Sequence, residues 1–342
     1  MKITTNYDGS SIEIINNNEE LNIVELSLKK ENKKYSHYYN FKVENEKKEK
    51  GTIIIKNIDN SPYYSNETVY LPYIKKPQSE WEKIDSKTVS ILKDRLEIKI
   101  EPEENMEISL VPRYTHNELN EFIKTIKSES KINIEEDVLT KIEFGEKSAP
   151  TILVIGRQHP GETLSSFFIE GMIKAVLSNQ EKFKKYHFVF FPIVNVIGVQ
   201  KGNHRYTNNV DYNRSWNKKD TPKEIKYLKE QIKLNRIKYF IDIHNDEITS
   251  KDYIRTDFNI EKEQIANIQV LKDVTKLRRF IRALIKERKI IKLKDKTARE
   301  YVKKIYKCKS ILLELSMKED YRKLEKKGFK FILELLGENN EK

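Results

Sequence analysis

The sequence predicts an α/β fold in which helices cover both faces of a sheet, preceded by a smaller domain rich in β-strands. From residue 151 onward, short apolar runs alternate with helical patterns, which is typical of an α/β sheet. Before residue 110, strand-like runs separated by polar turns replace the helical patterns. A chain of 342 residues has room for two hydrophobic cores. We therefore expect a β-rich, sandwich-like domain over residues 1–112 and a second domain over residues 113–342.

Two runs define the strands expected in the first of these domains. Residues 38–43 are rich in aromatic side chains, and residues 52–57 form a β-branched run. The boundary between the domains falls near residues 111–118.

The second domain shows strands and helices in alternation. Residues 151–155 form an apolar, β-branched run that ends at Gly156, so we expect a buried strand. After the loop that follows this strand, apolar side chains recur at helical spacing, which predicts a helix packed on the sheet. Its apolar face comprises Leu164, Phe167, Phe168, Met172, Ala175 and Val176. Further strands are predicted over 188–194, 239–244 and 310–315, and a closing helix over 321–336. In such sheets, ligands bind near the strand ends where connections diverge.

A histidine and a carboxylate follow the first of these strands. His159 and Glu162 are three residues apart, with Pro160 and Gly161 shaping the turn between them. Nitrogen and oxygen donors at this spacing can bind one face of a zinc ion, and a catalytic zinc needs a third protein ligand and an open position for water. His244, at the end of the predicted strand over 239–244, can supply that ligand. A His-x-x-Glu motif alone is a weak signal.

Further polar motifs follow along the chain at residues 202–205, 211–216, 242–244 and 310–314. In order and separation they resemble the zinc carboxypeptidases of the M14 family, and most closely the cytosolic carboxypeptidase branch, whose members remove glutamate from protein tails. That branch reads Arg-x-His-Pro-Gly-Glu-Thr at its first two ligands, as residues 157–163 do. Its Gly-Asn-Tyr-Arg and Asp-Leu-Asn-Arg-x-Trp stretches resemble residues 202–216, with one residue fewer between them here. The resemblance covers nearly the whole chain and implies a mixed sheet of zinc carboxypeptidase type.

The resemblance also implies a catalytic site with one Zn2+ per chain. Its metal ligands are His159, Glu162 and His244, and water takes the remaining position. Glu314 takes a proton from that water and later delivers it to the leaving amine. Asp211 orients the imidazole of His159. Considered without the resemblance, Glu314 is also compatible with a carboxylate that points outward from a leucine-rich strand.

Other positions that match the family pattern are expected to bind the substrate. Arg205 stabilises the oxyanion that forms at the scissile carbonyl. Asn213 and Arg214 bind the terminal carboxylate, which an arginine can do with two parallel hydrogen bonds. Arg299, found by counting back from the catalytic glutamate, lies at the base of the specificity pocket and favours an acidic side chain. From the residues alone, Arg205 is also compatible with an ordinary loop arginine, and Arg299 with a surface arginine.

Taken together, these residues predict a hydrolase, a metalloprotease of carboxypeptidase type. Its expected partner is the C-terminal tail of a peptide or protein, from which it removes one residue, Glu or Asp. One alternative is a relative that trims peptidoglycan stem peptides or deacylates a small amino acid. An alternative of another class is a non-catalytic binding protein that uses its basic surface, although the retained ligands and Glu314 argue against it.

Composition adds weaker constraints. The formal net charge is +12 and there is a single cysteine, Cys308, which excludes an intrachain disulfide and suits a reducing compartment. The densest basic stretch, 276–296, has apolar residues at helical spacing, so we interpret it as a helix with a solvated basic face and do not expect a nucleic-acid partner. The first residues lack the apolar core of a signal peptide, and no run reaches membrane-span length. We therefore expect a cytoplasmic protein with no membrane partner.

Overall fold

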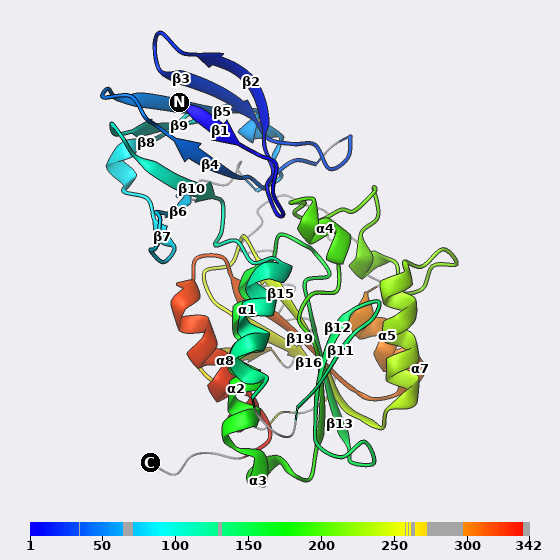
Figure 1. Cartoon of the computed structure of the whole chain (residues 1–342). Coiled ribbons are helices and arrows are strands. Elements are labelled where there is room, and N and C mark those ends of the chain that lie inside the picture. Colours follow the sequence, from blue (N-terminus) through cyan, green and yellow to red (C-terminus); the bar gives the residue numbers. More distant parts are fainter. Residues whose placement is uncertain are drawn as a thin grey trace. The chain divides into compact units, whose positions relative to one another are not determined.

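A computed structural model of the chain describes residues 1–33, 35–63, 71–128, 132–256, 258, 260, 264–271 and 297–337. The chain divides into a first unit, Met1–Thr115 with Ile197–Asn209, and a second unit, His116–Val196 with Val210–Lys342. The predicted fold class is confirmed: a β-rich part precedes a mixed sheet with helices on both faces (Figure 1). The basic stretch over 276–296 lies outside the described residues.

Two five-stranded sheets make up most of the described part of the first unit. One has the order β1 (Lys2–Thr4), β4 (Asn40–Glu44), β10 (Asn105–Ser109), β6 (Tyr73–Lys75) and β7 (Glu82–Lys83). The other has the order β2 (Glu13–Asn18), β3 (Ile23–Ser27), β5 (Gly51–Lys56), β9 (Arg95–Ile100) and β8 (Val89–Ile91). Burial alternates along β3, β5 and β9, so one face of this sheet is apolar and packed. The strands expected over 38–43 and 52–57 correspond to β4 and β5.

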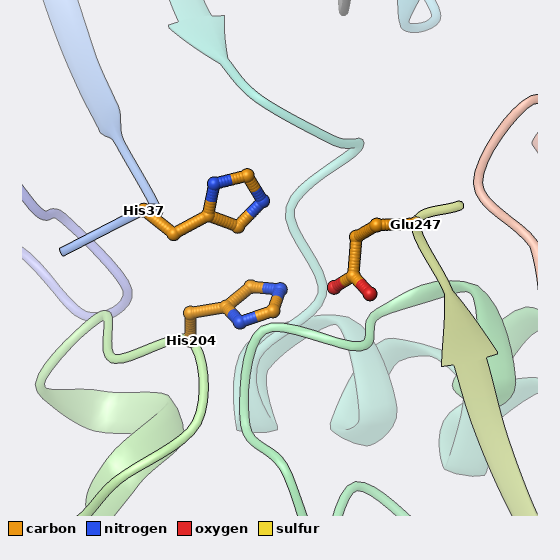
Figure 2. A group of neighbouring side chains, drawn as sticks. All are labelled: His37, His204 and Glu247. Atoms are coloured by element: carbon orange, nitrogen blue, oxygen red, sulfur yellow. The ribbon is translucent and has the colours of Figure 1, made fainter. Parts of the chain in front are cut away.

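The segment Ile197–Asn209 is far along the chain but packs with the first unit. The short helix α4 (Val196–Gln200) leads into it. Figure 2 shows the close approach of His37, which precedes β4, and His204 of this segment. Their ring centroids are 4.6 Å apart and nearly perpendicular, and His37 Nδ1 lies 2.7 Å from Ser61 Oγ. Burial and the neighbouring His204 lower the pKa of His37 well below its ordinary value, so this ring is neutral near pH 7.

The second unit is built on a sheet that has nine strands within the described residues. Their order is β11 (Ile132–Glu136), β12 (Thr140–Phe144), β14 (His187–Phe191), β13 (Thr151–Gly156), β15 (Ile237–Asp246), β19 (Lys309–Ser316), β16 (Tyr253–Thr256), β18 (Ile268–Leu271) and β17 (Gln264–Ile265). The four central strands, β14, β13, β15 and β19, run parallel, whereas β12 and β16 join them antiparallel. The C-terminal ends of the parallel strands therefore meet at one edge.

The observed strands differ from the predicted ones at their ends. β14 stops at Phe191, although the apolar run continues to Val194. Pro192 explains the difference, because proline has no backbone N–H to donate to a neighbouring strand. Conversely, β15 extends two residues beyond the predicted 239–244 at each end.

Helices cover both faces of this sheet (Figure 1). On one side are α1 (His116–Ile126), α2 (Leu164–Ser178) and α8 (Leu324–Leu335), and on the other are α5 (Lys223–Leu234) and α7 (Ala298–Tyr306). The short α3 (Gln180–Phe183) follows α2. The closing helix predicted over 321–336 is a 3-10 turn, Tyr321–Lys323, followed by α8. None of the helices in the described part of the chain combines the length and apolar character that a bilayer crossing requires.

Two glycines let α2 and α8 approach each other closely. A Cβ on Gly171 would lie 1.9 Å from the carbonyl oxygen of Glu325, and one on Gly328 would lie 2.0 Å from that of Phe168. Both distances are far below van der Waals contact, so neither helix can carry a larger side chain at these points without moving. Because α2 directly follows the loop of His159 and Glu162, its position also fixes that loop.

We expect Gly328→Ala to lower the free energy of unfolding by about 1–3 kcal/mol, because overpacking forces the two helix backbones apart. In a helix without this contact the same change would stabilise by roughly 0.5–1 kcal/mol. Urea denaturation followed by circular dichroism measures the difference, with Lys326→Ala, an exposed position of the same helix, as control. A Gly328→Ala protein as stable as the parent would show that the close approach is not a constraint.

Candidate metal centre

The loop between β13 and α2 presents His159 and Glu162. Its first residue, Arg157, has a left-handed backbone (φ 59°) and is 2% exposed. The guanidinium donates to the carbonyl oxygen of Pro160 from Nε (2.8 Å) and from Nη2, and Nη1 donates to Ser166 Oγ at 3.1 Å. The backbone N–H of Glu162 donates to the carbonyl of His159 at 3.2 Å. The buried guanidinium of Arg157 thus stabilises the turn, and the turn sets the direction of the His159 and Glu162 side chains.

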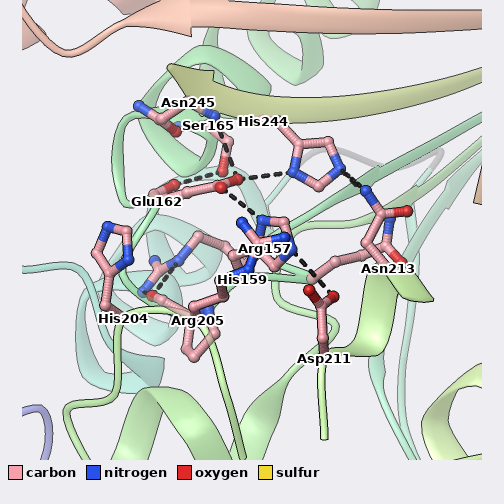
Figure 3. Close-up of polar contacts among 12 residues, drawn as sticks. Arg157, His159, Glu162, Ser165, His204, Arg205, Asp211, Asn213, His244 and Asn245 are labelled. Carbon is pink, nitrogen blue, oxygen red and sulfur yellow. Dashed lines mark hydrogen bonds and ion pairs between the residues drawn. The ribbon is translucent and has the colours of Figure 1, made fainter. Parts of the chain in front are cut away.

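Three buried side chains converge at the C-terminal ends of β13 and β15 (Figure 3). His159 Nδ1 lies 2.5 Å from Glu162 Oε1, and His244 Nδ1 lies 2.7 Å from Glu162 Oε2. One donor atom from each of the three residues lies within 4.8 Å of the other two. The sequence placed these residues on two strand ends, and the structure brings them together.

The outer nitrogens of both imidazoles face oxygen atoms. His159 Nε2 lies 3.2 Å from Asp211 Oδ1 (Figure 3), and His244 Nε2 lies 3.1 Å from Asp242 Oδ1. Histidines that bind metals typically donate their second N–H to a carboxylate in this way. Two imidazole nitrogens and a carboxylate oxygen are also the donors of many catalytic zinc sites. The residues therefore fit a zinc ion, held by His159, Glu162 and His244.

The charges of the cluster favour a cation. Burial alone would raise the pKa of Glu162, but His159 and His244 outweigh it and hold the pKa well below its ordinary value. Burial would lower the pKa of His244, but Asp242 and Glu162 raise it well above its ordinary value. Both shifts arise because groups of opposite charge lie next to each other in a small buried volume. Positive charge at this point, on a ring or on a metal ion, is therefore stabilised.

Glu314 lies beside this cluster because of strand register. It pairs with His244 across β15 and β19, and with Tyr253 across β16 and β19. Directly paired residues point to the same face of a sheet, so the half-buried Glu314 and the buried Tyr253 share a face with His244. Removal from water raises the pKa of Glu314 well above its ordinary value; His244 opposes the shift, and the carboxylates of Asp246 and Glu162 add to it.

Asn213 connects the metal centre to helix α7. Its side-chain nitrogen lies 3.1 Å from His244 Nε2, and its side-chain oxygen accepts from the backbone N–H of Ala298 at 2.9 Å. Its neighbour Arg214 is half-buried, and Nη1 of Arg214 donates to the carbonyl of Asn213 at 3.2 Å. Both residues lie in a 3-10 turn, Tyr212–Arg214.

Two predicted residues remain, Arg299 and Arg205. Arg299 is in the first turn of α7 and is 6% exposed, with Nη1 donating to Glu300 Oε1 at 2.8 Å, so it is not a surface arginine. Arg205 belongs to the first unit, where its guanidinium lies 5.9 Å from the ring centre of Tyr206. Its role at the metal centre stays a prediction.

Sequence reasoning missed two residues that support the histidines. The buried Gln158 donates from Nε2 to Asp242 Oδ1 at 2.7 Å, and its Oε1 accepts from Trp216 Nε1 at 2.7 Å. Asp242 stands two residues before His244 on the same strand, so alternation along the strand places both on one face. That period of two is the signal that could have identified Asp242. No sequence signal indicated Gln158.

Comparison with known proteins gives two family matches. Residues 3–109 match the family model described as cytosolic carboxypeptidase N-terminal domain, and residues 126–329 match the model described as zinc carboxypeptidase. Cytosolic carboxypeptidase 1 of Danio rerio is 37% identical over 75 residues, which are 20% of this chain and 6% of that protein. A Plasmodium falciparum relative with a zinc carboxypeptidase name is 36% identical over 104 residues, which are 27% of this chain and 6% of that protein.

Two solved structures share the fold over nearly the full chain. A metallo-carboxypeptidase from Burkholderia cenocepacia has a TM-score of 0.80 at 17% identity, covering 98% of this chain and 98% of that one. A metallo-carboxypeptidase from Pseudomonas aeruginosa, in complex with (2-guanidinoethylmercapto)succinic acid, has a TM-score of 0.78 at 18% identity, covering 99% of this chain and 100% of that one. At these identities the similarity establishes the fold.

We expect purified protein to contain about one zinc ion per chain, because two imidazole nitrogens and one carboxylate oxygen form an ordinary catalytic zinc site. His159→Ala and His244→Ala should each remove it, and mass spectrometry of the metal content measures the loss. His116→Gln, which changes a histidine outside the cluster, is the control and should keep its zinc. Stoichiometric zinc in the His159→Ala protein would contradict the ligand assignment.

Proposed function

The chain belongs to the zinc carboxypeptidase family, and from that premise we propose that it is a zinc-dependent enzyme that removes one C-terminal residue, preferably Glu or Asp, from peptides or protein tails. The resemblance predicted from the motifs is thereby confirmed. The observation that carries the proposal is the meeting of His159, Glu162 and His244 with Glu314 paired beside them. The matches to the curated relatives named above cover 6% of their length, so activity and substrate remain our proposal.

The reaction is hydrolysis of the last peptide bond. His159, Glu162 and His244 would hold the zinc ion, which would supply a Lewis acid that lowers the pKa of water toward neutrality. Glu314 accepts a proton from the attacking water and returns it to the leaving amine nitrogen, so one C–O bond forms as one C–N bond breaks. Asp211 holds the ring of His159, and Asp242 that of His244. Arg205 stabilises the negative charge that develops on the carbonyl oxygen.

Selection for a chain end comes from Asn213 and Arg214. The guanidinium of Arg214 can pair with both oxygens of a terminal carboxylate. The side-chain oxygen of Asn213 accepts from the backbone N–H of Ala298, and its amide N–H groups are donors next to the metal centre. A substrate without a free α-carboxylate leaves these donors unpaired, which makes the enzyme an exopeptidase.

An acidic terminal side chain is the preferred one because of Arg299. The start of α7 is tied to the metal centre through the hydrogen bond from Ala298 to Asn213, and Arg299 is the next residue. A buried guanidinium favours a carboxylate by charge and by bidentate geometry. Arg255 of β16 is a second arginine to consider, since it pairs with Leu312 and shares the sheet face of Glu314.

The alternatives differ in substrate or in class. An enzyme that trims peptidoglycan stem peptides, or one that deacylates a small amino acid, can use the same three ligands. Retention of Asn213 and Arg214 favours a substrate with a free α-carboxylate, which the first of these also has. A non-catalytic binding protein has no need of Glu314. We further propose the cytoplasm as location, from the single cysteine and the cytosolic carboxypeptidase N-terminal domain.

Glu314→Gln should lower turnover about a hundredfold or more, because the amide cannot accept the proton of the attacking water. Zinc content should stay at the parent value, which separates loss of the proton acceptor from loss of the metal. Release of the last residue from a peptide, followed by mass spectrometry, measures turnover. Unchanged turnover would remove Glu314 from the mechanism, and an inactive parent enzyme would favour the binding protein.

Peptides ending in Glu or Asp should be cleaved in preference to peptides ending in Leu or Lys, as a peptide library varied at its last residue can measure. Arg299→Ala should lower kcat/KM on acidic ends, which corresponds to a loss of about 2–4 kcal/mol of transition-state stabilisation. The reason is that the substrate carboxylate then enters the pocket unpaired. Cleavage of Leu ends should change little. Arg255→Ala is the matched comparison. A loss confined to that variant would transfer the specificity to Arg255, and equal losses on all ends would contradict both assignments.

A further inference from the structure

The segment that carries Arg205 is shaped by contacts with the N-terminal part of the chain. The backbone N–H of Gly9 donates to the carbonyl of Gln200 at 3.0 Å. Gly202 has a left-handed backbone (φ 62°), and a Cβ on it would lie 2.3 Å from the carbonyl oxygen of Ser10. All these residues belong to the first unit. The path of residues 200–202 therefore follows the surface of residues 9–10.

One carboxylate then fixes residues 204–206. Glu31, in the loop after β3, accepts the backbone N–H groups of His204 on Oε1 at 2.5 Å, and of Arg205 and Tyr206 on Oε2 at 2.8 and 2.7 Å. Hydrogen bonds to an ionised acceptor are about twice as strong as neutral ones. Three successive N–H groups can point at one anion only in a narrow set of backbone conformations, as in anion-binding nests. The direction of the Arg205 side chain from its Cα is thereby fixed.

The same loop supports the residues on both sides of Arg205. The hydroxyl of Tyr35 lies 2.5 Å from His204 Nδ1, and the ring of Tyr35 packs edge-on against Tyr206 with centroids 5.3 Å apart. Tyr206 in turn lies beneath the guanidinium of Arg205. Glu31 holds the backbone and Tyr35 the flanking side chains, so two neighbouring residues of the N-terminal part set the geometry of one arginine.

We propose that Glu31 is a positioning residue for Arg205: it holds the backbone of the arginine that the proposed mechanism assigns to oxyanion stabilisation. The inference rests on the proposed role of Arg205. Preorganised donors lower the barrier because they need no reorientation when charge develops, and a displacement of about 1 Å can cost roughly a hundredfold in rate. Loss of Glu31 should therefore lower kcat and leave zinc and substrate binding largely intact.

The test is a double-mutant cycle on the zinc-loaded, full-length protein with one peptide substrate. Arg205→Ala should lower kcat by about 100-fold or more, as loss of an oxyanion donor does. Glu31→Ala should lower kcat by about 10- to 100-fold with KM and zinc content close to the parent values. The double variant should be no slower than Arg205→Ala, because Glu31 acts through the arginine. Glu25→Ala, which removes a carboxylate paired with Lys56 in the same unit, should match the parent.

Each other result overturns a different statement. Full kcat in Arg205→Ala would remove Arg205 from the mechanism, and with it this inference, while peptide cleavage itself would still stand. A slow Arg205→Ala with a fast Glu31→Ala would overturn the positioning role alone. Losses that multiply in the double variant would mean that Glu31 acts on the fold and not on the arginine. If Glu31→Ala does not fold, Glu31→Gln takes its place in the same cycle. Its smaller loss of kcat should vanish when Arg205 is also changed to Ala. A loss of kcat that persists in that double variant overturns the proposal.

Discussion

The carboxylate of Glu162 lies between His159 and His244, and the rest of the second unit is arranged around that contact. One of its oxygens faces the ring of His159 and the other faces the ring of His244. The three polar side chains therefore lie in contact in a buried place. Buried charges are tolerated only when they are paired and hydrogen-bonded. The surrounding residues do both: Asp211 and Asp242 accept from the outer nitrogens, and Asp242 is in turn bound by Gln158. The cluster therefore depends on a shell of polar residues as much as on its three members.

Parallel strands are what bring the parts of the site to one place. His244 lies near the C-terminal end of β15, the loop of His159 and Glu162 follows β13, and Glu314 of β19 pairs with His244. After the loop, Gly171 lies against the backbone of Glu325 and Gly328 against the backbone of Phe168, so helix α2 packs closely on α8. A change in helix packing would thus move the N-terminal end of α2, and the loop of His159 and Glu162 with it. Packing energy and site geometry are coupled through this one helix.

Local features of the site could be predicted from the sequence, but the distant contacts could not. Strand β13 and the turn after it follow from an apolar run closed by glycine, and Pro160 with Gly161 indicates the turn. The pairing of His244 with Glu314 depends on register between strands some seventy residues apart, which periodicity does not determine. The role of Gln158 as a support was missed because a buried amide has no distinctive spacing. Pro192 explains why one strand was predicted too long. The packing of residues 197–209 with the first unit also left no local signal, since these residues follow a β-strand of the second unit.

That last segment has a consequence for how the protein is made. The chain passes from the first unit to the second after Thr115, returns at Ile197 and leaves again after Asn209. During synthesis, the N-terminal sheets can form early, but the surface made by Ser10, Glu31 and Tyr35 stays uncovered until residue 209 has been translated. The two units are therefore unsuitable for separate expression. A cut after Thr115 would leave the first unit without residues 197–209. The second unit would carry these residues without the contacts that hold them in shape. The first unit is therefore completed only after a large part of the second unit has been synthesised.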